Sequence, residues 1–481
     1  MCRSIPYRLP GQVDGGPDRF RPDTGHMPIW NQSQDLSLVD GQAAVWWLDL
    51  ASPFGDTPHG IDWTIEFPEG LTICDVTQRP HFGVGPDAHR PHIAHDNGAL
   101  HMSFPGYLPG EQRRRPMTHH TTWCELYYPL VVTADEAVDG SEVIIHRRAL
   151  GDHDTRRLPL TILSDPGLQP PPRQRRNVQA DFLPWFSRAE QEALAIVLRR
   201  CGITDVNLNW HTFGIPLLPA TVYAESIAIL RREMPGVRIW IGGMPGADCA
   251  LPRAEGIYQR DIPFVANPQV ATTVGRDLVI ANESHWCQIT GADGVMITCF
   301  EPVLVDDDPW PPHCFSYANR QQFADEIGLR SVPDPIAIRM RHPDHWLDFC
   351  SRQMARLIAL ARHGHRDLPL ALCQIGRHTP VSSAASHGWQ SLGAMADISI
   401  FIHHTEDGSD HAQERWGLTR LGGLPQAWWE HGNDSLGSIT DPSLLVPDMK
   451  MQTALSGGAG VRLWNWARCH GRHQQALMEW R

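Results

Sequence analysis

The chain has 481 residues, of which 42% are hydrophobic and 20% charged, so it can bury large cores and exceeds one ordinary domain. Its 41 basic and 54 acidic side chains give a net charge of −13, which argues against nucleic-acid and anionic-membrane partners. No apolar run reaches bilayer length, and the 11 scattered cysteines include no C-x-x-C pair, so we expect a cytoplasmic protein without disulfides or membrane spans.

The sequence pattern of the first part of the chain predicts β-structure. From about residue 40 to 163, apolar and polar side chains alternate in short runs such as A-V-W-W-L-D-L and S-E-V-I-I-H-R, with turn residues between them. This pattern predicts an antiparallel β-sandwich, which we assign to an accessory domain over residues 1–164. The segment 165–177, D-P-G-L-Q-P-P-P-R-Q-R-R-N, is rich in proline and arginine and predicts a linker.

The pattern changes after the linker to strands that alternate with helices. The first strand is predicted at 178–184. Ser187, with Glu190 three residues later, predicts a capping box at the start of a helix, and Gly202 predicts its end. Seven more strands are predicted at 203–210, 237–243, 294–300, 368–375, 397–403, 426–430 and 461–466.

Further helices are predicted at 221–233, 273–287, 315–327 and 344–363. Strands that alternate with helices favour a parallel sheet, because a crossover helix returns the chain to the same edge. Eight such units predict an α/β protein with a closed (β/α)₈ TIM barrel over residues 178–481, which we assign to the catalytic domain.

Two glutamates stand at matching places in this repeat. Glu301 in I-T-C-F-E-P follows the fourth strand, and Glu430 in A-W-W-E-H-G ends the seventh. Barrel enzymes keep their chemistry at the C-terminal ends of the strands, and a carboxylate there is costly to bury unless it is paired or used. Two carboxylates across one cleft are the groups that glycoside hydrolysis requires. We therefore predict that Glu301 and Glu430 are catalytic.

Other polar and aromatic side chains follow the same strand ends and are candidate contacts for a sugar, whose C–H faces stack on indole rings while its hydroxyls bond polar groups. They are Asn209, Trp210, His211, Asp248, Gln374, His403, His404, Glu406 and Trp429. We predict a carbohydrate substrate and no cofactor, and a homo-oligomer is compatible with the sequence. Pyridoxal and Schiff-base chemistry would need Lys450, because it is the only lysine.

The order of a β-sandwich and a barrel, with glutamates ending strands four and seven, resembles the retaining glycoside hydrolases of clan A. The resemblance covers roughly residues 178–481. It implies that Glu301 is the general acid/base, that Glu430 is the nucleophile, and that Trp464 or Trp466 floors the first sugar site. The clan usually has asparagine before the acid/base, whereas this chain has Phe300. A retaining mechanism implies carboxyl groups about 5–5.5 Å apart.

Two other functions remain open at this stage. A metal-dependent barrel enzyme of the sugar isomerase or amidohydrolase type would use His403, His404, Glu406 and Glu301 as ligands. Against it, the first strand, V-Q-A-D-F-L-P-W, lacks the His-x-His that metal-dependent hydrolase barrels usually place there. A non-catalytic carbohydrate-binding protein would keep the tryptophans without working acids. We predict no metal at the site.

Histidines also cluster in the first part of the chain, in the segment 89–101. His92, His95 and His101 are a weak candidate for a metal site, because closeness in sequence does not imply that side chains converge.

Overall fold

The computed structural model describes the chain in segments. Apart from single residues between 352 and 362, these are 36–49, 61–75, 92–103 without 97, 127–134, 139–149, 152–167, 177–209 without 183 and 185, 219–243, 289–297, 317–349 without 347, 367–375, 395–404, 427–432, parts of 443–450, 460–464 and 471–480. The described elements are divided between two compact units, with boundaries at Ile241/Gly242 and Glu430/His431.

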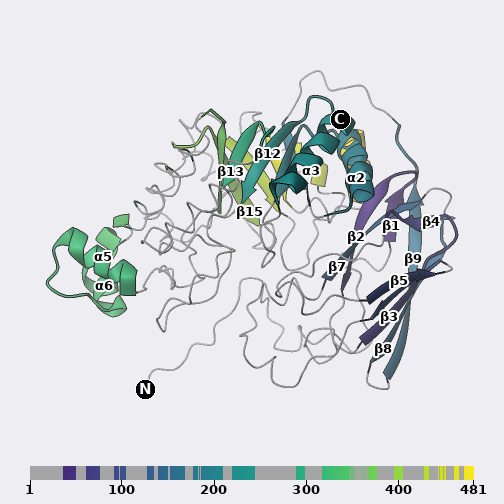
Figure 1. Cartoon of the computed structure of the whole chain (residues 1–481), viewed down its shortest axis with the longest axis horizontal. Helices are drawn as coiled ribbons and strands as arrows, with labels where there is room; N and C mark the ends of the chain where they lie inside the picture. The colour runs from purple at the N-terminus through teal and green to yellow at the C-terminus, as the bar shows by residue number, and fades with distance from the viewer. Residues whose placement is uncertain are drawn as a thin grey trace. The chain divides into compact units, whose positions relative to one another are not determined.

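One unit contains two β-sheets from the first part of the chain (Figure 1). The six-stranded sheet has the order β1 (Leu36–Val39), β9 (Asp152–Leu163), β8 (Glu142–Ala149), β3 (Ile61–Glu66), β6 (Ala99–Ser103) and β5 (His92–Asp96). The three-stranded sheet has the order β2 (Ala43–Asp49), β7 (Tyr127–Ala134) and β4 (Leu71–Ile73).

The two sheets share one hydrophobic core. Alternate residues of their strands are buried in a single cluster, which includes Trp46 from β2 and Trp63 from β3. Because side chains alternate between the faces of a strand, each sheet contributes one apolar face to this cluster. Opposite charges pair on the other face of the six-stranded sheet, as in the contact of Arg148 with Asp62 at 2.9 Å.

The pairing of β1 departs from the antiparallel prediction. β1 runs parallel to β9, with Leu36 opposite Leu160, whereas β3, β5, β6, β8 and β9 pair antiparallel with one another. The strands β1, β4 and β5 were not predicted, because each has only three to five residues and a local pattern too short to recognise.

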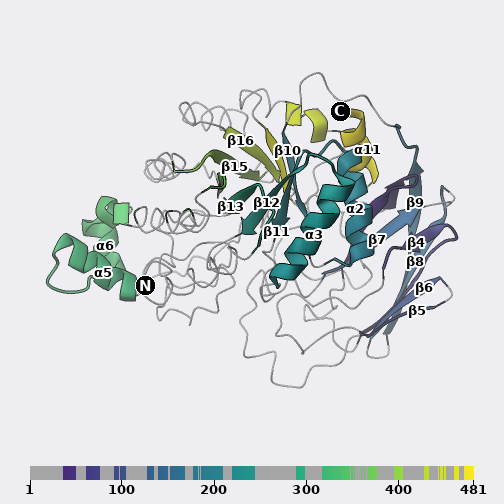
Figure 2. The same ribbon diagram turned by 45° about the horizontal axis from the view of Figure 1, so that its top comes forward.

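The same unit contains the start and end of the strand–helix repeat (Figure 2). Its elements are β10 (Val178–Phe182), α2 (Arg188–Arg200), β11 (Asp205–Asn209), α3 (Ala220–Glu233), most of β12 (Arg238–Gly243), β17 (Val461–Trp464) and α11 (Gly471–Trp480). β10 lies between β11 and β17 and is parallel to both.

Helix α2 confirms the signals read from its sequence. The Ser187 side chain accepts a hydrogen bond from the backbone N–H of Glu190, and the Glu190 carboxylate accepts one from the N–H of Ser187 at 2.8 Å. Gly202 follows the helix with a φ of 74°, a conformation in which glycine avoids the strain of a Cβ atom. The apolar residues Leu194 and Leu198 are buried, as their helical spacing predicts.

The last helix packs against strands from the beginning of the chain. The side chain of Gln474 in α11 donates to the carbonyl oxygen of Ala43 at 3.1 Å, and the backbone N–H of Arg472 donates to the Ser37 hydroxyl at 3.2 Å. Gly471 begins the helix where no side chain fits against the backbone of β1. The N-terminal sheets and the end of the chain therefore fold as neighbours.

The other unit holds β13 (Gly294–Ile297), α5 (Tyr317–Ile327), α6 (Pro335–Arg341), β14 (Leu370–Ile375), β15 (Ile398–His404) and most of β16 (Ala427–Gly432). β14 is parallel to both β13 and β15. Phe323 of α5 and Ile338 of α6 form a small core with Trp346 and Phe349, which follow α6 in the chain. In this core the rings of Phe323 and Trp346 meet edge to face at 5.0 Å.

The eight predicted strands of the repeat coincide with β10 to β17, with boundaries shifted by up to three residues. Helix α6 was not predicted; Asp334 caps it and Pro335 occupies its first turn. The predicted helix 273–287 lies outside the described residues, as does most of the predicted linker. Asp165, the first linker residue, forms an ion pair with Arg200 of α2. In the described part of the chain, no helix has the length and apolarity needed to cross a membrane.

We predict that Gly471→Ala will destabilise the contact between α11 and β1. The new Cβ atom would lie 2.6 Å from the backbone nitrogen of Leu38, and backbone cannot rotate away as a side chain can. Overpacking of this kind costs about 1–3 kcal/mol of unfolding free energy, which denaturant titration can measure. Glu479→Ala, on an exposed position of the same helix, is the control. Equal losses in both variants would contradict the close packing at Gly471.

Asp397 predicts a pH dependence of stability. The Arg362 guanidinium holds the pKa of this carboxyl below its ordinary value, and the backbone N–H of Leu370, 2.8 Å away, also lowers that pKa. A folded-state pKa below the unfolded value of about 3.9 stabilises the fold above that pH. The stabilisation is lost as the pH falls through the still lower folded-state pKa. Because the pair is almost half exposed, solvent screening limits its contribution to about 0.5–1 kcal/mol.

Asp397→Asn should therefore lower the unfolding free energy at pH 7, and its difference from the wild type should shrink as the pH falls below about 4. Chemical denaturation across this pH range measures both. A constant difference at every pH would show that the charge of Asp397 does not contribute.

Candidate functional site

The predicted site residues that the structure places lie near the C-terminal ends of parallel strands. Asn209 is the last residue of β11, and Trp464 is the last residue of β17. In the other unit, Gln374 is next to the end of β14, His403 and His404 end β15, and Trp429 and Glu430 lie in β16. The backbone positions thus match the strand ends at which barrel enzymes carry out their chemistry.

The remaining predicted residues fall outside the described part of the chain. These are Glu301, Trp210, His211, Asp248, Glu406 and Trp466. Glu301 comes four residues after Ile297, the last residue of β13. The assignments of Glu301 as acid/base and of Trp466 as a sugar platform therefore stay predictions.

Strand register shows which of two adjacent strand-end residues shares a face with a residue of the next strand. The sequence alone does not distinguish them. Position 374 is opposite Phe401, so position 403, two residues further along β15, is on the same face as 374. Position 404 is on the other face. In β16, the same alternation places positions 428 and 430 on one face and 429 on the other. His403 therefore fits a shared site with Gln374 better than His404 does, and Trp428 shares a face with Glu430.

A polar layer that the sequence analysis missed crosses β17, β10 and β11. Gln179 in β10 is opposite both Asp205 in β11 and Arg462 in β17. All three are buried, with at most 1% of their surface exposed. We call these three residues the inner polar layer. The alternation in V-Q-A-D-F, D-V-N-L-N and V-R-L-W was the signal that could have revealed it.

The opposite face of these strands is apolar. Ala180 is in register with Val206 and Leu463, and all three are buried. A parallel sheet covered by helices uses its apolar face for that contact. The polar face, which carries the inner polar layer, also carries Asn207 and the register positions 209 and 464.

Asp205 is the charged centre of this face. Its carboxylate accepts hydrogen bonds from the Trp240 indole N–H at 2.9 Å and the Thr204 hydroxyl at 2.6 Å, and it pairs with Arg238 at 2.7 Å. Removing a carboxylate from water is costly unless donors replace the lost hydration. Three donors do so here, and they fix the orientation of the Trp240 ring.

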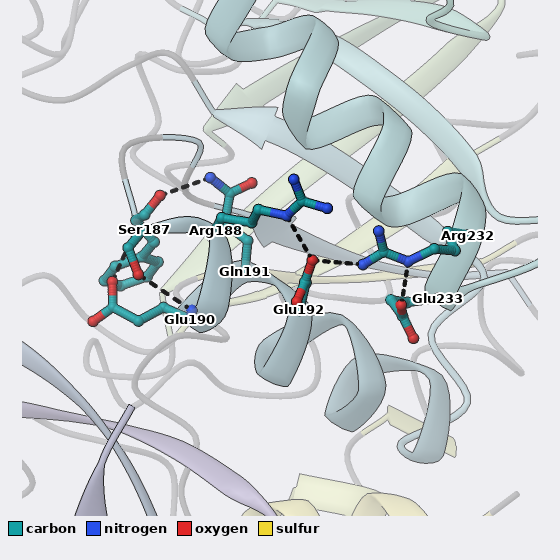
Figure 3. A network of polar contacts seen from close by, with 8 residues as sticks. Ser187, Arg188, Glu190, Gln191, Glu192, Arg232 and Glu233 are labelled. Atoms are coloured by element: carbon teal, nitrogen blue, oxygen red, sulfur yellow. Dashed lines mark hydrogen bonds and ion pairs between the residues drawn. The ribbon is translucent and has the colours of Figure 1, made fainter. Parts of the chain in front are cut away.

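The loop after β10 is held to helix α2 (Figure 3). The Gln191 side chain donates to the carbonyl oxygens of Pro184 at 3.1 Å and Phe186 at 2.7 Å. On the exposed side, Glu192 accepts from Arg188 of its own helix and from Arg232 of α3. These contacts order a loop at the C-terminal end of a strand, where loops of barrel proteins bind ligands.

Strand register separates two of the histidines in the segment 89–101. Ala94 is opposite His101 and Leu100 is opposite His95, so positions 95 and 101 are on different faces of the sheet. The Nδ1 atom of His101 instead lies 3.2 Å from the Thr64 hydroxyl. Among the residues that the structure describes, no group of three histidine, cysteine or carboxylate side chains could hold a metal ion.

Comparisons with known proteins find solved structures of low similarity. No protein-family model and no curated protein matches the sequence. The β-galactosidase of Bacillus circulans sp. alkalophilus is 10% identical, with a TM-score of 0.47 over 64% of this chain. The β-galactosidase of Rahnella sp. R3 is 11% identical, with a TM-score of 0.44 over 63%. This chain covers 55% of each of these two structures.

A third solved structure, the 3-keto-D-glucoside 4-epimerase YcjR of E. coli, is 10% identical with a TM-score of 0.35. The match covers 63% of this chain and 98% of that one. Glycoside hydrolases and an epimerase are thus both among the similar structures, and at this level the likeness concerns the backbone alone.

Proposed function

We propose that this protein is a glycoside hydrolase that cleaves a glycosidic bond with retention of configuration, using Glu301 and Glu430. The observation that carries the proposal is the position of Glu430 in β16, two residues before the end of the seventh strand of the strand–helix repeat. A carboxylate at that place, after two tryptophans, fits the binding and cleavage of a sugar.

The proposal includes a closed (β/α)₈ barrel of clan A type over residues 178–481, joined by the linker 165–177 to an accessory β-sandwich domain. Parallel pairing of β10 with β17, the first and last strands of the repeat, supports closure, because an open sheet in chain order would leave both strands at edges. Two sheets around one core support the sandwich.

In the proposed mechanism the two carboxyl groups divide the work. The Glu430 carboxylate attacks the anomeric carbon while Glu301 donates a proton to the leaving oxygen, which gives a glycosyl-enzyme ester and a free alcohol. Glu301, now a carboxylate, takes a proton from water. The resulting hydroxide equivalent attacks the anomeric carbon and releases Glu430.

Predicted strand-end residues in each unit are the proposed sugar contacts. Gln374 and His403 share one face of β14 and β15, so they are the proposed hydroxyl contacts on that side. Asn209 and Trp464 are the corresponding positions on β11 and β17, with an indole ring able to stack on the sugar. Trp428 joins these candidates, because it shares a face with Glu430.

We predict distinct kinetic defects for the two glutamates. Glu430→Ala should abolish turnover of aryl glycosides, and added azide should restore some turnover by forming the opposite anomer. Glu301→Ala should lower rates by about 10²–10⁴-fold on poor leaving groups, the usual contribution of a positioned acid. Dinitrophenyl glycosides, which need no proton on the leaving group, should be spared in the first step.

The control is Glu479→Ala, a glutamate exposed on α11, which should retain wild-type rates. Equal losses on good and poor leaving groups, without azide rescue in either variant, would overturn both assignments. Loss of wild-type activity on dialysis against a chelator, with recovery on adding a divalent metal, would favour the metal-dependent alternative instead.

A further inference from the structure

Gln179 differs from two other buried glutamines of the same unit. Gln191 donates to the carbonyl oxygens of Pro184 and Phe186, and Gln474 donates to that of Ala43. Gln179 is fully buried, yet neither its amide oxygen nor its amide nitrogen has a hydrogen-bond partner among the residues that the structure describes. A buried amide without partners lowers stability, and an apolar side chain of the same size would not.

The neighbours of Gln179 do not compete for its amide. The two oxygens of Asp205 already accept from Thr204, Trp240 and Arg238. Arg462, on the other side, is a donor group that cannot accept a hydrogen bond. The inner polar layer therefore contains a carboxylate that has its own donors, together with an amide that can both donate and accept.

The inner polar layer is on the same face as predicted sugar contacts of its own unit. Asn207 is two residues further along β11 on the same face, and positions 209 and 464 follow toward the strand ends. Successive residues on one face of a strand are about 7 Å apart, so the layer lies roughly one sugar ring below the strand-end positions.

We infer that Gln179 is a substrate-recognition residue, whose amide binds a hydroxyl group of the sugar that reaches deepest between β10, β11 and β17. The inference rests on the proposed function and adds to it a specificity determinant. A hydroxyl both donates and accepts, so it matches the oxygen and nitrogen of the amide, whereas a carboxylate could only accept. The preferred ligand at this position is thus a neutral sugar hydroxyl.

The test compares Gln179→Met with the wild-type full-length protein. Methionine keeps the length and flexibility of glutamine but removes both polar atoms. Without sugar, the variant should melt at the same temperature as the wild type or higher, because no protein hydrogen bond is lost. Calorimetric titration with glucose and galactose should show about tenfold weaker binding of whichever sugar the wild type binds.

Gln474→Met is the matched control, because its amide has a partner in the protein. It should melt at a lower temperature and bind the sugar as the wild type does. A series of deoxy sugars completes a double-mutant cycle: the deoxy sugar that lacks the contacted hydroxyl should bind equally well to the wild type and to Gln179→Met.

The outcomes separate this inference from the proposed function. Unchanged sugar affinity in Gln179→Met would overturn the inference alone, and a lowered melting temperature with unchanged affinity would assign the amide to an internal structural water. If the wild type neither binds these sugars nor cleaves any aryl glycoside, both proposals fail. If it cleaves aryl glycosides but binds neither sugar, recognition of a free sugar hydroxyl through Gln179 is overturned while the hydrolase proposal stands.

Discussion

The parallel pairing of β10 with β17 is the contact on which the arrangement of the unit with the N-terminal sheets depends. It joins the first strand of the repeat to the last, although most of the repeat lies between them in the chain. Once these strands pair, β11 follows on the other side of β10, and α11 follows β17 to the strands at the beginning of the chain. Local contacts alone would not bring these distant segments together.

The same three strands separate two chemical environments by simple alternation. One face is apolar, and the other carries buried polar groups that are costly to keep away from water. Asp205 illustrates the compensation, because the hydroxyl, indole and guanidinium groups around it replace its lost hydration. A buried strand face of this kind is more polar than the branched aliphatic layers that usually fill parallel barrels. Natural proteins retain such departures from optimal stability most often where ligands bind.

Much of the fold could be predicted from local patterns. The capping residues Ser187 and Glu190 and the glycine at 202 marked the ends of α2 because their effects involve only near neighbours in the chain. The parallel position of β1 could not be predicted in this way, because its partner β9 is more than a hundred residues away and no turn links the two. The docking of Gly471 on β1 shows its reason only when both backbones are in place.

The candidate site could also be predicted only in part from local sequence patterns. Strand ends can be read from apolar runs, so the positions of Gln374, His403 and Glu430 on their strands could be expected. Which of two adjacent residues shares a face with another strand depends on register, and register requires the partner strand. The inner polar layer was not predicted for a different reason. Its residues lie away from the C-terminal ends of their strands, whereas the site was predicted from residues at those ends.

The contact between α11 and the strands β1 and β2 has a consequence for biosynthesis. Ser37 and Arg472, which meet in it, are 435 positions apart. A ribosome exposes the N-terminal sheets long before it makes α11, so the surface of β1 that α11 covers stays open until α11 has been made. This unit can complete its packing only after α11 has been synthesised, and such long-range closure slows folding. During that interval the uncovered edge of the sheet is a surface that a chaperone would be expected to protect.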